Sequence, residues 1–398
     1  MSNNNKNCPV RKCPWGAQFN DEIKFFIACC QTNPSSDDHK VIHSYLNTEH
    51  FTLHTLIGLA NQHGILPLVY KTIKSLPTTH YQLPAKILPE INAQYMSISK
   101  RNMLMSAELI RIIQLLEKNS IKAIAFKGPT LSQILYGDIT LRQYGDLDVL
   151  VKKEDIYKID TLLKDLGYQR VLKLTPVQEK IYIQNAQDLG FYHSKNGLLF
   201  EMHWSLLNED YPLKINLDTI WETPQTISIN QHKIKTFPTE ELLTYLCIHG
   251  SKHLWERIEW IKDIDLLIRK KDIDWGKVVK QVDGSGFEAM IYLGLSLAKE
   301  LFKTPLPKNV TNHISDMKIL ITLSDFVLEN WQSPKNTFQQ TYIKLKLFPG
   351  IKEQAVFLHK ILIKPSLNDY QFIDLPKSFY WVYYFVHPYL LIKKYLTK

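Results

Sequence analysis

The sequence has few cysteines, no apolar run long enough to cross a bilayer, and no internal repeat. Its five cysteines are too few for a disulfide-rich secreted scaffold, so we expect free thiols in a reducing compartment. Cys8 and Cys13 have no His or Cys partner at zinc-finger spacing, which disfavours a metal site there. The start of the chain contains no apolar signal core, and with no transmembrane segment we expect a cytoplasmic protein.

The composition is that of an ordinary globular protein, with 45% hydrophobic and 22% charged residues. At 398 residues the chain is long enough for two or three domains and a sizeable core. Its formal net charge of +9 favours anionic partners, and nucleotides, nucleic acids and membrane surfaces all meet that description. Composition therefore leaves the function open, and the motifs must decide it.

The stretch from Phe126 to Val151 carries the strongest motif of the chain. Its last residues, DLDVLV, alternate in the period of a β-strand, which points Asp146 and Asp148 to the same side. Two like charges on one strand face repel each other, and a bound cation relieves that repulsion. Because Mg²⁺ prefers hard oxygen ligands and is held by one or two carboxylates plus substrate phosphates, the two aspartates predict a magnesium site.

The beginning of the same stretch predicts an anion site. Residues 122–126 read as a short apolar strand, and Lys127-Gly128-Pro129 then turns into the helical pattern TLSQILY. Proline suits the first helical position, and the free amides of a helix start bind anions. We therefore expect Lys127 and Gly128 to contact phosphates, since glycine lets a phosphate approach the backbone. Arg142, in the loop after this helix, either orients a triphosphate or pairs with the carboxylates.

A hairpin further along the chain supplies a third carboxylate. Asn196-Gly197 separates two apolar runs, which is a strong hairpin signal. In the second arm, the alternation places Glu201 and His203 on one face of the strand. Glu201 is the natural partner of the two aspartates, and the alternative is a glutamate on a solvated strand face. For Asp146 and Asp148 the alternative is a surface acidic pair, and for Lys127 it is a solvated lysine.

The order of these motifs resembles the nucleotidyltransferase superfamily with the DNA-polymerase-β-like core. The string K-G-x-x-L…Y-G…R-x-x-x-D-x-D-x-L-V resembles one branch, the bacterial nucleotidyltransferase family proteins of unassigned substrate. The strings at 60–68 and 201–204 resemble the same family. Many relatives have Gly-Gly or Gly-Ser at the turn where Lys127-Gly128-Pro129 stands here, so a serine contact to phosphate does not carry over.

The resemblance implies a fold, a cofactor and a set of site residues. The fold is α+β, a small mixed sheet with helices that is flanked by N- and C-terminal helical regions. The cofactor is Mg²⁺, with Mn²⁺ as a substitute, and the substrate is a nucleoside triphosphate such as ATP. The implied residues are Asp146, Asp148 and Glu201 as catalytic metal ligands, and His203, His253 and Trp255 as lining of the nucleotide pocket. For His253 and Trp255, plain helix packing is an equal alternative.

We predict five regions from the pattern of the chain. They are a disordered N-terminus (1–16), a helical region (17–95), the catalytic core (96–237), a helical bundle (238–305) and a basic, aromatic-rich helical region (306–398). Within them we expect a linker at 77–89, a long helix at 91–119, a helix at 154–166, a strand at 169–174, and helices at 238–253, 255–269, 275–282 and up to 302. The predicted buried stripe of the long helix is Leu104, Leu109, Ile112, Ile113 and Leu116. Thr239 is the predicted N-cap of the helix at 238–253.

Two features outside the motifs have competing interpretations. His249 and His253 stand four apart, as zinc ligands do, but no Glu follows His249, so we favour packing over metal binding. Residues 341–398 carry nine lysines against three acidic residues, and 379–392 is rich in aromatic residues. Such a segment stacks on bases or sits at a membrane surface, but we favour a buried helix with a solvated basic end.

The function that these motifs predict is magnesium-dependent transfer of a nucleoside monophosphate from a triphosphate to an acceptor hydroxyl, with release of pyrophosphate. The acceptor is a small molecule, a sugar, a peptide or a protein, and nucleic acid is less favoured. One alternative is an Asp-x-Asp glycosyltransferase that uses a nucleotide-sugar, although it normally needs a larger nucleotide-binding half before the motif. The other alternative is a non-catalytic module that binds a nucleotide or a partner.

Overall fold

The structure is a computed structural model that describes residues 19–48, 51–76, 85–209, 211–373 and 375–396. The predicted disorder of residues 1–16, both cysteines of that segment and most of the predicted linker lie outside the described residues. The other three cysteines are buried free thiols, as expected. No helix among the described residues is long and apolar enough to cross a membrane.

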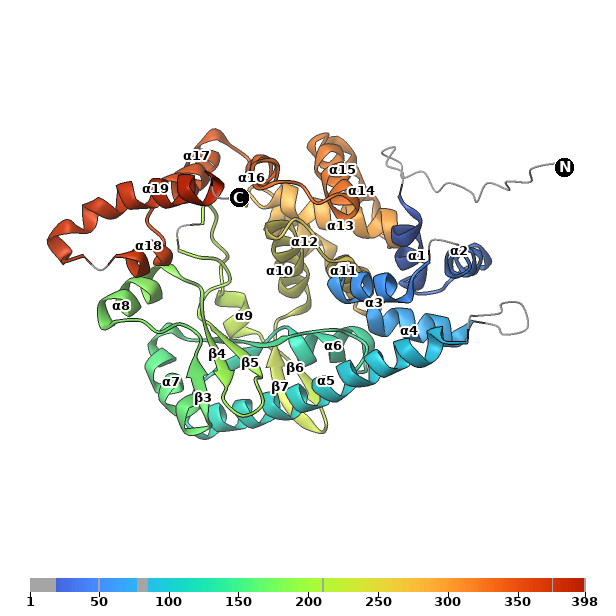
Figure 1. The fold of residues 1–398 in the computed structure, drawn as a ribbon, viewed down its shortest axis with the longest axis horizontal. Helices are drawn as coiled ribbons and strands as arrows, with labels where there is room; N and C mark the ends of the chain where they lie inside the picture. The colour runs from blue at the N-terminus through green and yellow to red at the C-terminus, as the bar shows by residue number, and fades with distance from the viewer. Residues whose placement is uncertain (1–18, 49–50, 77–84, 210, 374, 397–398) are drawn as a thin grey trace.

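The core contains a five-stranded mixed sheet in the order β1-β2-β5-β4-β3. It lies in the lower part of Figure 1, where β3, β4 and β5 are labelled. β2 runs parallel to β5, and the other neighbours are antiparallel. The strands are β1 Ala123–Ala125, β2 Asp146–Val151, β3 Tyr168–Arg170, β4 Asp188–His193 and β5 Leu199–His203. β4 and β5 form the predicted hairpin, in which Gly197 takes a φ of +66°. The α+β prediction with a small mixed sheet is confirmed.

Helices cover the two faces of the sheet with two separate sets of apolar side chains. On one face, α5 (Ile87–Lys118) and α7 (Ile156–Asp165) pack Leu109, Ile113 and Ile159 against Val149 and its neighbours. On the other face, Ile124, Phe126 and Leu150 join the core of α6 (Gly128–Tyr136) and α10 (Thr239–Lys252). Asp146 and Asp148 belong to this second face, beyond the end of its apolar part. The site therefore lies between the sheet and the helices that follow it.

Helical regions precede and follow the core, as the fold prediction expects. The N-terminal helices are α1 Asp21–Cys29, α2 Ser36–Leu46, α3 Leu53–Gln62 and α4 Leu66–Ser75. The C-terminal helices are α11 Ile258–Lys270, α12 Trp275–Val282, α13 Glu288–Phe302, α14 Lys308–Asp316, α15 Ile319–Gln332, α16 Thr337–Lys346, α17 Ile351–Leu362, α18 Leu367–Phe372, η2 Lys377–Val382 and α19 Tyr383–Leu396. The long helix α5 runs without a break across the proposed boundary at residues 95 and 96.

Several local predictions were incomplete. The structure adds a short 3₁₀ turn η1 (Lys153–Asp155), the helices α8 (Pro176–Asn185) and α9 (Asp218–Glu222), and a two-stranded sheet of β6 (Gln225–Ile229) and β7 (His232–Thr236). The predicted strand at 169–174 is only the short β3. Leu104 of the predicted stripe is exposed, and Met105 is buried in its place. Thr239 is the first residue of α10 rather than its cap.

The prediction of a buried aromatic helix near the C-terminus is wrong. Tyr383 and His387 of α19 are buried, but Trp381, Phe385 and Tyr389 are more than half exposed. The reason is that α19 contacts the rest of the chain along one side only, through α17 and α18 at the edge of the molecule (Figure 1).

Candidate active site

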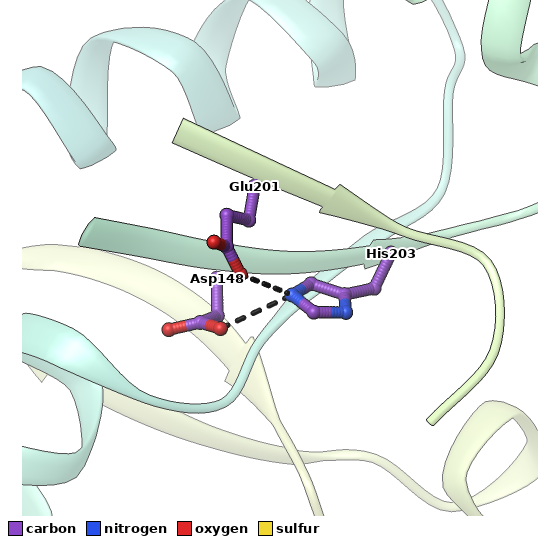
Figure 2. Close-up of side chains that lie close together, drawn as sticks. All are labelled: Asp148, Glu201 and His203. Atoms are coloured by element: carbon purple, nitrogen blue, oxygen red, sulfur yellow. Dashed lines mark hydrogen bonds and ion pairs between the residues drawn. The ribbon is translucent and has the colours of Figure 1, made fainter. Parts of the chain in front are cut away.

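Two neighbouring parallel strands bring the predicted acidic residues together. The register of β2 and β5 places Asp148 opposite Glu201. His203 lies two residues further along β5, on the same face, and its Nε2 is 3.1 Å from Asp148 Oδ1 and 3.4 Å from Glu201 Oε2 (Figure 2). The ligand atoms of these three side chains all lie within 4.8 Å of one another, a spacing that one metal ion can bridge. Asp146 stands two residues before Asp148 on the same strand.

Lys127 and Gly128 join this group from the end of β1. Lys127 Nζ lies 2.8 Å from Asp148 Oδ1, so the lysine pairs with the buried carboxylate. Gly128 begins α6 with a φ of +54°, and a Cβ there would stand 3.0 Å from the backbone oxygen of Asp146. This position therefore favours glycine because of its left-handed backbone and its close contact with β2. Pro129 follows at the start of α6, as predicted.

Burial and charge set the protonation of the site. Burial opposes ionisation of Asp148, but Lys127 and His203 more than offset it and hold the pKa of Asp148 well below its usual range. The negative charge of Asp148, followed by burial, raises the pKa of Asp146 to about 6. Burial would lower the pKa of His203, but its hydrogen bonds to Asp148 and Glu201 raise it to about 9. The carboxylates are thus balanced by two cations that both contact Asp148.

One oxygen of the site has no partner. Asp148 Oδ2 is buried and makes no hydrogen bond, although the other carboxylate oxygen contacts both cations. An unpaired buried carboxylate oxygen is costly, because it has lost water without gaining a donor. Asp148 and Glu201 offer hard oxygen ligands, and His203 offers a nitrogen once a cation displaces its proton, so the group fits a divalent cation.

The loop from Gly137 to Gly145 is held by the C-terminal bundle and leads directly into Asp146. Arg142 is buried and makes two close contacts with the carboxylate of Asp263 on α11, at 3.0 Å and 2.9 Å. The backbone N–H of Gln143 donates to Glu259 Oε1 at 2.9 Å. The predicted choice for Arg142 was a triphosphate or the two aspartates of the motif, but its partner here is Asp263. Arg142 thus fixes the loop that positions β2.

The three side chains predicted to line the pocket lie in different surroundings. His203 lies within the acidic group. His253 is half-buried, and its ring packs against those of His249 and Trp260 at centroid distances of 4.8 Å and 5.7 Å. Trp255 is fully buried between Gly250 and Gly294, in the core of the helical bundle.

Lysines of the C-terminal half lie close to the site and were not predicted. Lys252 Nζ of α10 lies 3.3 Å from Gln187 Oε1, next to the start of β4. Burial, the ammonium of Lys127 and, more weakly, those of Lys360 and Lys344 lower the pKa of Lys252 to about 8. The only hint in the sequence was the position of Lys252 in the string H-G-S-K-H. Lys344 of α16 and Lys360 of α17 are therefore close enough to Lys252 to act on its charge.

Comparison with solved structures finds distant similarities. One is the solution structure of the antibiotic-resistance factor ANT(2″)-Ia, with 10% identity, 42% of this chain and 84% of that chain covered, and a TM-score of 0.32. Another is an antigenic nucleotidyltransferase-like protein from Paracoccidioides brasiliensis, with 16% identity, 55% and 92% covered, and a TM-score of 0.31. No curated protein matches the chain. Residues 49–303, more than half of the chain, match the family model described as an uncharacterised nucleotidyltransferase, and the chain belongs to that family.

Proposed function

We propose that this protein transfers a nucleoside monophosphate from a nucleoside triphosphate, such as ATP, to an acceptor hydroxyl and releases pyrophosphate. Membership of the family supports nucleotidyl transfer as the class of reaction. The observation that carries the proposal is the meeting of Asp148 and Glu201 across β2 and β5, with Lys127 at 2.8 Å from Asp148.

Asp146, Asp148 and Glu201 are the proposed ligands of Mg²⁺ or Mn²⁺, and His203 is a further candidate. The free oxygen of Asp148 supports this assignment, because a cation would give it a partner. A divalent ion bound there would neutralise charge on the phosphates and on the attacking oxygen. Lys127, at the start of α6, would then interact with both Asp148 and the phosphates.

The reaction needs one bond to form and one to break. The acceptor oxygen attacks the α-phosphorus in line, and the bond from the α-phosphorus to the oxygen that bridges to the β-phosphate breaks. The electron pair of that bond leaves with pyrophosphate. The hydroxyl proton passes to a carboxylate, and we assign this to Glu201, whose side chain is 38% exposed and therefore accessible to an acceptor. The lysines beside the site would hold the β- and γ-phosphates.

The test of the activity incubates the purified protein with each α-labelled nucleoside triphosphate, Mg²⁺ and a cell extract. The expected result is label transfer with pyrophosphate release that Asp148→Asn lowers by about 10²–10³-fold, the cost of removing one main electrostatic contact to the reacting group. Asp155→Asn, on the surface just after β2, is the matched control and should keep full activity. No transfer by the wild type under any of these conditions would reject the proposal.

The phosphate contacts have a separate test in equilibrium binding of a non-hydrolysable triphosphate with Mg²⁺. Lys252→Met should weaken binding by about tenfold, because a charged hydrogen bond contributes roughly 1.5–3 kcal/mol. Lys280→Met, an exposed lysine on α12, is the control and should bind as the wild type does. Equal affinity of the wild type and Lys252→Met would remove Lys252 from the phosphate site without touching the assignment of the carboxylates.

The same experiments separate the alternatives. A glycosyltransferase would bind a nucleotide-sugar and transfer the sugar, leaving the α-phosphate label on the released nucleotide. A non-catalytic module would bind the triphosphate with Mg²⁺ and release no pyrophosphate with any extract. The present proposal predicts that the label itself moves to the acceptor.

A further inference from the structure

The C-terminal region exposes an apolar surface that the nucleotidyl transfer does not use. Trp381, Phe385, Tyr389 and Ile392 are 61%, 69%, 56% and 59% exposed. Phe385, Tyr389 and Ile392 share one side of α19, because they are four and three residues apart. Trp381 belongs to the preceding 3₁₀ helix η2, and its ring lies beside that of Phe385 at a centroid distance of 6.1 Å. We call these four residues the C-terminal stripe. Globular proteins rarely expose so continuous a row of large apolar side chains without a partner.

The opposite side of α19 is firmly attached to the protein. The hydroxyl of Tyr383 donates to the backbone oxygen of Ile373 at 2.7 Å and accepts from the N–H of Leu375 at 3.1 Å. His387 contacts Asp369 Oδ2 at 2.8 Å through Nδ1 and the backbone oxygen of Ile361 at 3.0 Å through Nε2. These contacts fix the rotation of the helix, so the C-terminal stripe faces away from the protein.

The sequence segment that carries the stripe has one dominant sign of charge. Residues 341–398 carry nine lysines and three acidic residues. Of the acidic residues, Asp369 is buried and paired with His387, so it contributes little to the outer surface. Lys393 is exposed directly after Ile392. A surface that combines Trp, Tyr and Phe with lysines matches the boundary between the headgroups and the acyl chains of an anionic membrane.

We propose that the C-terminal stripe docks on the surface of an anionic phospholipid bilayer, with α19 lying in the plane of the membrane. Lipid is favoured over nucleic acid because Ile392 of the stripe cannot stack on a base. The charge favours lipid over a second copy of the chain, because two lysine-rich surfaces repel each other. No described helix can span the bilayer, so the contact is peripheral.

The test is co-sedimentation of the full chain with vesicles of phosphatidylcholine alone and of phosphatidylcholine mixed with phosphatidylserine. The wild type should sediment with the anionic vesicles and less so at high salt. The triple variant Trp381→Ser, Phe385→Ser, Tyr389→Ser should bind at least tenfold more weakly, with an unchanged circular dichroism spectrum. The control variant Met96→Ser, Met103→Ser, Leu104→Ser changes exposed apolar residues of α5 and should bind as the wild type does.

Four results would overturn the proposal. In the first two, the wild type stays in the supernatant with both kinds of vesicle, or it binds neutral and anionic vesicles equally. In the other two, the triple variant binds vesicles as well as the wild type does, or the wild type binds single-stranded RNA and no vesicles. Sedimentation velocity would add a fifth, a wild-type dimer that the triple variant dissociates. None of these readouts depends on catalysis, so the membrane proposal and the proposed function fail separately.

Discussion

The buried pair of Arg142 and Asp263 gives the sharpest prediction, because it connects the loop before Asp146 to the C-terminal bundle. The side chains are 7% and 0% exposed, and three nitrogen–oxygen distances between them lie from 2.9 to 3.1 Å. Two unit charges about 4 Å apart attract each other by roughly 4 kcal/mol at an effective dielectric constant of about 20. Removing one partner of such a buried pair costs about 3–5 kcal/mol, since the other charge stays buried.

We therefore expect Asp263→Asn to lower the free energy of unfolding by about 3–5 kcal/mol. Arg142→Met should cost somewhat less, because burial already raises the pKa of both Asp263 and the nearby Glu259, and these carboxyl groups can take up protons. The double variant Arg142→Met, Asp263→Leu leaves neither charge of the pair buried. Its loss in free energy of unfolding should be smaller, by about 2 kcal/mol or more, than the sum of the losses of the two single variants.

The assay is equilibrium unfolding in urea, followed by circular dichroism and by tryptophan fluorescence. Glu329→Gln, which removes the surface pair of Glu329 with Lys335, is the control and should cost less than about 1 kcal/mol. Single variants of Arg142 and Asp263 within 1 kcal/mol of the wild type, or strict additivity in the double variant, would refute the reasoning. The two single variants should also weaken triphosphate binding to a similar extent. If Arg142 bound a phosphate directly, only Arg142→Met would weaken that binding.

Three further outcomes follow from the same structure. Gly128→Ala should lower stability by about 1–2 kcal/mol in urea unfolding, because of its positive φ and the 3.0 Å approach to the Asp146 carbonyl, and unchanged stability would show that the turn relaxes. Burial lowers the pKa of His63 to about 4, so near pH 5 this imidazole is protonated in the unfolded chain but not in the folded protein. The free energy of unfolding should therefore fall by about 2 kcal/mol from pH 7 to pH 5. His63→Phe should reduce that loss, and an unaltered pH profile would contradict the assignment. Gly250→Ala places a Cβ 2.4 Å from the Trp255 ring and should destabilise the protein by about 1–3 kcal/mol, seen as a lower thermal midpoint, and a wild-type midpoint would show that the ring can shift.

The sequence predicted the elements whose signals are local. The alternation of β2, the Asn-Gly turn before β5 and Pro129 at the start of α6 each depend on adjacent residues, and the structure has all three elements. The α+β class came from the resemblance of their order to the nucleotidyltransferase superfamily. Because β2 and β5 are neighbours, Glu201 and Asp148 lie side by side, as the motif order implied.

The missed elements lack such signals. Only Ile183 of α8 is buried, so this helix has no apolar stripe to read, although Thr175 and Gln178 form its capping box. The turn between β6 and β7 takes its positive φ values from Asn230 and Gln231 rather than from glycine, which hid the hairpin.

The missed contacts are tertiary. Arg142 and Asp263 are 121 residues apart, and no local pattern relates them. Lys252 comes from α10, and the lysines that act on its charge come from α16 and α17, which lie beyond the residues that match the family. The orientation of α19 is a tertiary property too, since its sequence alone does not say which side faces the protein.

The unbroken length of α5 affects how this protein can be dissected. The helix has 32 residues, about 48 Å at 1.5 Å per residue, and it carries α4 at one end and the sheet at the other. A fragment that starts at residue 96 would cut the helix in its third turn and remove Tyr95, whose ring stacks on Tyr70 at 4.4 Å. Limited proteolysis should therefore spare α5, and a minimal active fragment should retain the whole helix together with α4.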